Sequence, residues 1–360
     1  MSKARQLADN AAAEPNKNMV INGAMQVNQR GNVTGKTAAT FGGPDRFALG
    51  ITSHGTYSIS QSTTVPTGYG FPTSYKLDCT TADTSIAANA EVTIQYKMEG
   101  QDLQRLKKGT SSAEAVTISF WCKSNLTGTY TLEIYDSDNT RHFPQNYTIS
   151  SADTWEHKVL TFAGDTTGTF SNDNAHSAVL VWWLAAGSNY TGGTQSTAWA
   201  SASSANTRVS SSIVNMSSST SNEFLLTGVQ MEVGSYNTPF EFESYETTLE
   251  KCYRYYHSSY VPGTTPGASN AVNADCTLQT AWNDGNAPFP HFPKEMRAAP
   301  SVVVRGRGGN TTGEVNQNGS GVSGVPTNIQ AKFVHYLNSG GGSSNAGTYT
   351  TYSYECDAEL

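Results

Sequence analysis

The chain has 360 residues, of which 37% are hydrophobic, 10% aromatic and only 14% charged, and its formal net charge is −7. This composition excludes a disordered acidic tail, because the aromatic content is too high, and an ordinary nucleic-acid binder, because no run of Lys or Arg occurs. It also excludes membrane insertion, because the longest apolar run, at 178–186, is far shorter than the roughly 18–20 residues of a spanning helix.

The first 17 residues differ from the rest of the chain. Residues 2–13 are mostly good helix formers, and Pro15 ends the segment. An isolated helix this short is marginal in water, so the segment either needs a partner or frays as a free terminus. No apolar stretch follows Met1, so we expect no signal peptide.

From Met19 onward the sequence has the alternation of β-strands. In residues 116–122, every second side chain is apolar and therefore faces the same side of a strand. Residues 178–184 are apolar at successive positions, which predicts a central strand covered on both faces. Further strands are predicted at 129–135, 155–162 and 223–233. Short strands separated by turn residues predict an antiparallel β-sandwich.

Two stretches break this pattern with helical spacing. Residues 100–109 are long enough for one or two helical turns. Residues 244–257 predict a short helix that connects two domains, with Ser244 as a candidate N-cap. The residues at helical spacing in this second stretch are Leu249, Cys252, Tyr253 and Tyr256.

Residues 258–360 form the predicted second domain, which is smaller and β-rich. A loop region with five prolines covers 258–297, and strand patterns return at 301–305, 329–336 and 348–356. Because the last strand runs to the chain end, we expect the C-terminus to be tied into a sheet. Few aliphatic side chains are available for this length, so we expect a small core or an oligomer interface.

The five cysteines are far apart, odd in number and without a C-x-x-C pair. This spacing argues against a cysteine zinc site and predicts buried or half-buried free thiols in a chain folded in a reducing cytosol. We expect neither a metal nor a cofactor. The alternative is calcium at residues 136–139, Asp-Ser-Asp-Asn, which start like a calcium loop but lack its central Gly and terminal Glu.

No catalytic motif is recognisable: the nucleophile elbow, the H-E-x-x-H zinc motif, the P-loop and the dinucleotide fingerprint are all missing. We therefore expect a protein that is not an enzyme. The carboxylates that could serve a glycosidase are Glu91 and Glu99, or Glu133, Asp136 and Asp138. We interpret them as solvated or turn carboxylates.

The remaining chemistry is a surface rich in hydroxyls, amides and aromatic rings, which suits carbohydrate. Rings stack on the apolar face of a pyranose, while amides and charged groups bind its hydroxyls. Adjacent strand residues face opposite sides, so one of Trp182 and Trp183 belongs to the core. The candidate ligand contacts in the sandwich are Trp183, Tyr190 and Trp199. In the second domain they are Trp282, His291, Phe292, Arg305, Arg307 and Tyr336.

An ordered set of motifs resembles tail-fibre and related virion proteins of bacteriophages. The first is Asn18-Met-Val-Ile-Asn-Gly-Ala-Met-Gln-Val-Asn-Gln-Arg-Gly, followed by Pro44-Asp-Arg-Phe. The later segments match in order, at 99–106, 119–125, 227–234, 239–241, 252–256, 292–301 and 357–360. The motif residues also have structural interpretations. Asn22-Gly23 predicts a turn, Gly228 predicts close sheet packing, and Arg30 and Arg46 predict pairs with carboxylates.

The resemblance implies a jelly-roll β-sandwich similar to carbohydrate-binding modules over 18–243, a connecting helix over 244–257 and a distal β-rich domain over 258–360. It also implies a homotrimer in the virion, assembled in the host cytoplasm. Residues 1–17 would attach it to other tail or baseplate proteins. No receptor-binding residue is carried over from the family.

The sequence leaves three functional hypotheses. The first is a non-catalytic phage tail fibre that binds a host polysaccharide or lipopolysaccharide. The second is a capsid-decorating fibre or tail adaptor without receptor contact. The third is a polysaccharide depolymerase, although no internal repeat of a tailspike solenoid is visible.

Overall fold

The computed structural model describes residues 17–267, 276–279, 286–287, 289–306, 311–317, 320–338 and 349–360. The all-β prediction is confirmed: strands predominate in these residues, and the paired strands run antiparallel. The helical segment predicted within residues 1–17 lies outside the described residues, apart from Lys17. No helix in the described part of the chain is long and apolar enough to cross a membrane.

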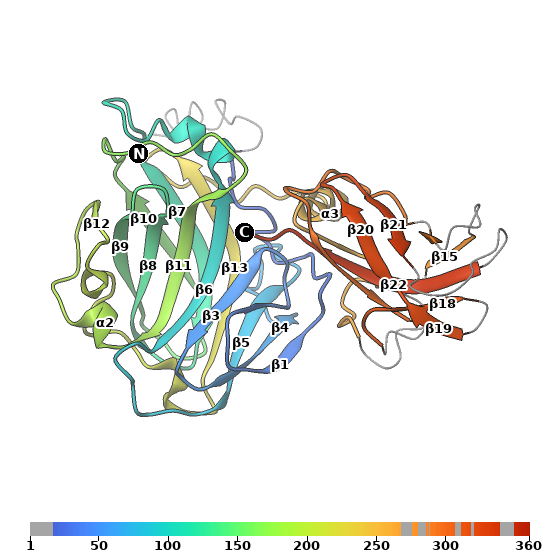
Figure 1. Ribbon diagram of the computed structural model, residues 1–360. Coiled ribbons are helices and arrows are strands. Elements are labelled where there is room, and N and C mark those ends of the chain that lie inside the picture. The colour runs from blue at the N-terminus through green and yellow to red at the C-terminus, as the bar shows by residue number, and fades with distance from the viewer. Residues whose placement is uncertain are drawn as a thin grey trace. The chain divides into compact units, whose positions relative to one another are not determined.

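The chain divides into two compact units (Figure 1). The sandwich unit comprises residues 1–26, 34–41 and 47–243, and the C-terminal unit comprises residues 27–33, 42–46 and 244–360. Two short segments from the start of the chain therefore group with the C-terminal unit, although the sequence pattern alone places them in the sandwich.

Two sheets stack face to face in the sandwich unit (Figure 1). The first, sheet A, has the strand order β1 (Val33–Lys36), β4 (Thr56–Ser62), β5 (Ser74–Thr81), β13 (Glu223–Val233), β7 (Val116–Ser124) and β10 (Glu156–Phe162). The second, sheet B, has the order β12 (Ala200–Ser201), β9 (Arg141–Ile149), β8 (Gly128–Asp136), β11 (His176–Ala186), β6 (Glu91–Glu99), β3 (Phe47–Thr52) and β2 (Thr40–Phe41).

The core lies between the two sheets and follows the alternation read from the sequence. Ile118 and Phe120 of β7 are fully buried, and the ring of Phe120 meets Trp182 of β11 edge-on at 5.8 Å between centroids. The central-strand prediction for 178–184 is confirmed, because β11 is the middle strand of sheet B and is buried on both faces. Trp182 faces sheet A, so the next residue, Trp183, faces the outer side of sheet B.

Short helical turns complete the sandwich. The turn predicted at 100–109 is the 3-10 helix η1 (Gly100–Leu106), whose Leu103 and Leu106 are buried. The loop between β11 and β13 carries α2 (Ser188–Thr191), η2 (Ala205–Thr207) and η3 (Met216–Ser218).

The C-terminal unit is β-rich, and its last strand is tied into a sheet, as the sequence predicts. β22 (Tyr349–Asp357) pairs with β14 (Tyr256–Ser258), β15 (Cys276–Gln279), β17 (Ser301–Arg305) and β18 (Glu314–Gln317). β19 (Ser320–Ser323) pairs with β18, and a separate sheet contains β16 (Asn286–Ala287), β21 (Val334–Asn338) and β20 (Val325–Ile329). The single strand expected at 329–336 is instead a hairpin, because Gln330 donates its backbone N–H to Phe333 and closes a tight turn.

The helix predicted in 244–257 is α3 (Tyr245–Tyr253), and it belongs to the C-terminal unit. Ser244 caps it as predicted, because its Oγ accepts a hydrogen bond from the Thr247 backbone at 3.1 Å. The prediction of free thiols is confirmed as well. Cys79, Cys122, Cys252 and Cys356 are buried, and Cys276 is half-buried.

Candidate functional site

The outer face of sheet B is partly covered by the loop that follows β11. Val179, Val181 and Trp183 of β11 point toward this loop, where Val209 packs against them. A hydrogen bond of 3.1 Å from the Val209 backbone to the carbonyl of Tyr190 ties the loop to itself. The loop therefore adds polar and aromatic side chains to a sheet face that would otherwise be open.

Glu133 of β8 lies at the centre of this face and is fully buried. Its carboxylate accepts hydrogen bonds from the Trp183 indole at 2.9 Å and from His142 Nδ1 at 2.9 Å. The Arg208 guanidinium adds a two-pronged contact, with Nε and Nη2 each 2.8 Å from a carboxylate oxygen. A buried carboxylate with this many donors is a stable anchor for the loop.

The electrostatics keep Glu133 ionised. Burial by itself would raise its pKa, but the charge of Arg208 and the hydrogen bonds from His142, Arg208 and Trp183 outweigh burial and lower the pKa below its ordinary value. A carboxyl of this kind is a poor general acid, because it holds no proton near neutral pH.

Arg208 is surrounded by aromatic rings. Its guanidinium carbon lies 4.8 Å from the Tyr135 centroid, 5.0 Å from Trp183 and 5.9 Å from Tyr190. The arginine side chain is 19% exposed, so one edge reaches the surface. Its Nη1 has no hydrogen-bond partner within the described ranges, which leaves a donor for a ligand.

Polar side chains continue from Arg208 onto β6. The Gln95 amide donates to Glu91 at 3.2 Å and to Thr93 at 3.0 Å, and the Tyr190 hydroxyl lies 3.4 Å from Glu91. Glu91, Gln95 and Tyr190 are half-buried. We call the group formed by Glu91, Gln95, Glu133, Trp183, Tyr190 and Arg208 the Arg208 site.

The Arg208 site suits a polyhydroxylated ligand. It combines a ring, an amide, a carboxylate and a guanidinium within one sheet face, which is the mixture of apolar and polar groups found in small-molecule sites. Trp183 is fully buried, so it supports the other side chains from below. Tyr190 and Arg208 are the groups that reach the surface.

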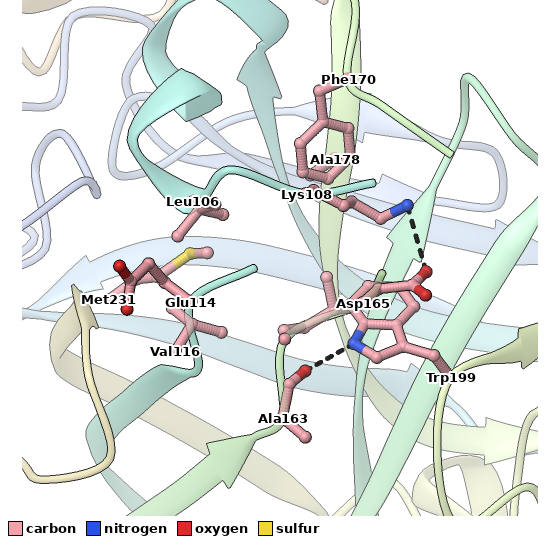
Figure 2. A pocket seen from close by; sticks show the side chains of 12 residues that line it. Leu106, Lys108, Glu114, Val116, Ala163, Asp165, Phe170, Ala178, Trp199 and Met231 are labelled. Atoms are coloured by element: carbon pink, nitrogen blue, oxygen red, sulfur yellow. Dashed lines mark hydrogen bonds and ion pairs between the residues drawn. The ribbon is translucent and has the colours of Figure 1, made fainter. Parts of the chain in front are cut away.

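Trp199 lies elsewhere, beside a buried lysine (Figure 2). The Trp199 indole donates to the Ala163 carbonyl at 2.7 Å, and Lys108 Nζ lies 5.3 Å from its ring centroid. Lys108 itself contacts Asp136 at 2.6 Å and Asp165 at 3.1 Å. Trp199 and Tyr190 are close in the sequence, but they belong to different sites in the fold.

The pocket around Lys108 is small. Its cavity volume is about 20 Å³, which is room for a water molecule but not for a pyranose ring. Asp136 also accepts from Asn139 at 3.0 Å, so its oxygens are engaged by an ammonium and an amide. Within the described ranges no cluster of three or more His, Cys, Asp or Glu side chains could hold a metal ion.

The candidates of the C-terminal unit do not gather into one site among the described residues. His291 is exposed beside Phe333, Phe292 is buried in the core, and Tyr336 is half-buried against His335. Arg305 forms an ion pair with Glu355. Trp282 and Arg307 lie outside the described residues.

The interpretation of the candidate glycosidase carboxylates as solvated or turn groups is wrong for Glu99, Glu133 and Asp136, which are fully buried because hydrogen bonds or ion pairs compensate them. Glu91 and Glu99 are at opposite ends of β6, about 26 Å apart at a rise of about 3.3 Å per residue. Glycosidase carboxylates lie about 5–9.5 Å apart. Glu133 faces Arg208, whereas Asp136 faces Lys108, as expected if they point to different sides of the sheet.

Sequence reasoning missed Arg208, Gln95 and the central role of Glu133. Arg208 lies in a Ser-rich loop, where no periodicity marks it. Glu133 was recognisable as a charged residue within an alternating strand, which is a signal of an outward-facing position.

No family model matches the chain, and no curated protein matches it. Among solved structures, the enzymatically active domain of tailspike protein 4 of bacteriophage CBA120 has 14% identity and a TM-score of 0.31, covering 61% of this chain and 22% of that chain. A CBM4 carbohydrate-binding module has 11% identity and a TM-score of 0.31, and the match covers 59% of this chain and 97% of that module. A family 11 carbohydrate-binding module of a Clostridium thermocellum cellulosomal cellulase has 12% identity and a TM-score of 0.28, and the match covers 57% of this chain and 98% of that module.

Proposed function

We propose that this chain is a phage tail-fibre protein that binds host surface carbohydrate without cleaving the glycan. The Arg208 site carries the proposal, because it presents a ring and a free guanidinium edge on an outer sheet face. The ordered motifs that resemble virion proteins support the assignment to a phage particle. The lowered pKa of Glu133, which makes it a poor general acid, supports binding rather than hydrolysis.

Each residue of the site has a defined part in this proposal. The Tyr190 ring stacks on the apolar face of a pyranose, and Arg208 Nη1 donates to a ring hydroxyl. Gln95 and Glu91 bind neighbouring hydroxyls through amide and carboxylate atoms. Glu133 and Trp183 hold Arg208 in place from below.

The charge of Arg208 is balanced by buried Glu133, so we infer a neutral sugar at this site. Binding to a neutral glycan should change little between about 0.05 and 0.5 M salt, because hydrogen bonds and stacking are not screened as free charges are. Each site is expected to be weak, and a trimer would bind a repeating polysaccharide through several sites at once.

The proposal is tested on an array of bacterial surface polysaccharides with the full chain. Tyr190→Ala and Gln95→Ala should each weaken binding, by about tenfold for the ring. Tyr236→Ala is the control, since Tyr236 is a 59% exposed tyrosine outside the site. Equal binding by the wild-type protein and all three variants would overturn the assignment of the Arg208 site.

Two further measurements separate this role from the alternatives. Excess purified protein should block adsorption of the matching phage, whereas a capsid-decorating fibre or tail adaptor without receptor contact would not compete. Mass analysis of the polysaccharide after incubation should find intact chains, and released oligosaccharides would indicate a depolymerase instead. Immunogold label at the tail would agree with the proposed attachment through residues 1–17, and label at the capsid alone would contradict it.

A further inference from the structure

Three aromatic rings meet on the outer face of sheet A, the side of the sandwich opposite the Arg208 site. Phe120 and Cys122 of β7 point into the core, so Trp121 between them points outward. His157 of β10 is its direct cross-strand partner, and their ring centroids lie 5.0 Å apart with planes inclined by 35°. Tyr69, from the loop between β4 and β5, packs against Trp121 with the ring centroids 4.2 Å apart and the planes inclined by 50°. We call Tyr69, Trp121 and His157 the Tyr69 platform.

The backbone is shaped to present these rings. Tyr69 stands between Gly68 at φ +86° and Gly70 at φ +80°, and 55% of it is exposed. Both flanking conformations are rare for residues with a side chain, so the loop turns the tyrosine outward at positions only glycine adopts readily.

A third glycine, Gly228 of β13, leaves space next to the Trp121 ring. At Gly228, φ is +62°, and a Cβ atom would lie 2.6 Å from Phe71 and 3.1 Å from Trp121. The absence of a side chain at Gly228 therefore leaves room for the rings of Phe71 and Trp121.

Hydrogen-bonding groups flank the rings. Lys123 lies two residues beyond Trp121 on the same face of β7 and is half-buried. It has no hydrogen bond or ion pair within the part of the chain described, so its ammonium is a free donor. Burial lowers the pKa of His157, which leaves the imidazole neutral near pH 7 and able both to donate and to accept.

The size of the platform decides between a sugar and a protein partner. A stable protein interface needs about 800 Å² from each side. Tyr and Trp each contribute about 150–250 Å² when fully buried, and Trp121 is already half-covered by its neighbours. These three rings by themselves fall short of that area, but they match the apolar face of one or two pyranose units. Phe242, which is 53% exposed, lies beside Gly70 and borders the platform.

We propose that the Tyr69 platform is a second glycan-binding site, in which pyranose rings stack on Tyr69 and Trp121 and their hydroxyls bind Lys123 and His157. This inference rests on the proposed carbohydrate-binding function and extends it to the opposite face of the same sandwich. Two sites on one chain would let it bind two stretches of polysaccharide and add avidity within a single copy.

The test uses the full chain on the same array of bacterial surface polysaccharides. Tyr69→Ala and Trp121→Ala should each weaken binding by about tenfold or more, the loss expected for a stacked ring. Tyr236→Ala is the matched control for an exposed tyrosine. Thermal unfolding should show that Tyr69→Ala, a change in the loop between β4 and β5, leaves the fold intact, and light scattering gives the molecular mass of each variant.

The outcomes separate this inference from the Arg208 site. Loss of binding in Tyr69→Ala with normal binding in Tyr190→Ala supports the platform and rejects the Arg208 site. The reverse pattern rejects the platform and keeps the proposed function, and loss in both variants supports both sites. A Tyr69→Ala protein of changed mass and unchanged binding would make the platform a contact between copies and overturn the inference. A wild-type protein that binds no polysaccharide would overturn both proposals.

Discussion

Individual buried charges in the sandwich depend on their partners, and Lys108 is the clearest case. Its side chain is 4% exposed, and Asp136 and Asp165 share its ammonium. Removing one member of a buried ion cluster leaves the others uncompensated, which typically costs about 3–5 kcal/mol. We expect Lys108→Met to lower the free energy of unfolding by about that amount, measured by urea denaturation.

The neighbouring Lys107 is the matched control. Its ion pair with Glu114 is open to solvent, with side chains 53% and 38% exposed. Exposed pairs contribute about 0–1 kcal/mol, so Lys107→Met should leave stability nearly unchanged. Similar losses in the two variants would show that the buried position of Lys108 has no special energetic role.

Glu133 makes stability depend on pH in a defined direction. Its pKa is lowered in the folded state, so its contribution is present above the ordinary value of 4.5 and is lost as the pH falls through the folded pKa. Glu133→Gln should therefore be less stable than wild type at pH 7, and the difference should shrink below pH 4.5. Urea midpoints at several pH values test this, and a constant difference down to pH 3 would contradict it.

At the scale of elements, Gly228 marks a place where β13 must leave space for side chains of its neighbours. An alanine at this position would have to adopt φ near +62°, and its Cβ atom would clash with the rings of Phe71 and Trp121. The backbone conformation costs about 1–2 kcal/mol, and overpacking adds about 1–3 kcal/mol. We expect Gly228→Ala to lower the thermal unfolding midpoint by the sum of both effects.

Gly35 in β1 separates these two effects. Its φ is +65°, but a Cβ atom there would meet nothing within 4 Å. Gly35→Ala should thus show only the backbone cost, and the difference between the two variants measures the packing cost. Equal midpoints would mean that the rings near Gly228 shift without a penalty.

At the scale of the whole molecule, the C-terminal unit is built from both ends of the chain. Arg30 and Arg46 form ion pairs with Glu359, as the sequence predicts for these arginines. Their guanidinium groups also lie over Tyr256 at 3.8 Å and Tyr255 at 3.4 Å. The Glu359 side chain is only 4% exposed, so without the arginines its carboxylate would be buried and unpaired.

A fragment of residues 244–360 should therefore fail to unfold cooperatively when expressed alone. It contains Glu359, Tyr255 and Tyr256 but lacks Arg30 and Arg46. Joining residues 27–46 to the fragment should restore cooperative thermal unfolding, followed by near-ultraviolet circular dichroism. Cooperative unfolding of the shorter fragment would show that the unit folds without these partners.

The proposed homotrimer predicts the molecular mass of the protein in solution. We expect light scattering to give a mass of about three times the 38.5 kDa of one chain, since several weak glycan sites need to act together. A monomer would favour a single-copy adaptor or a free carbohydrate-binding module, and adsorption would then rest on single-site affinity.

Much of the fold was predictable because alternation and burial are local signals. The apolar positions of 116–122 and the two-sided apolar run at 178–184 each indicate a strand without knowledge of its neighbours. The helix cap at Ser244 and the turn at Asn22-Gly23 are local in the same sense; in that turn, Met25 donates to the Asn22 carbonyl at 2.8 Å.

The candidate sites were not predictable in this way, because their members are distant in the chain. Glu133 and Arg208 are 75 residues apart, and no period links a strand residue to a loop residue. Tyr69 and Trp121 meet only because a loop crosses the outer face of sheet A. The sequence by itself determined which residues form strands and which side chains are apolar. The tertiary structure decided which polar and aromatic groups meet, because strand order and loop paths are settled by packing of the whole sandwich.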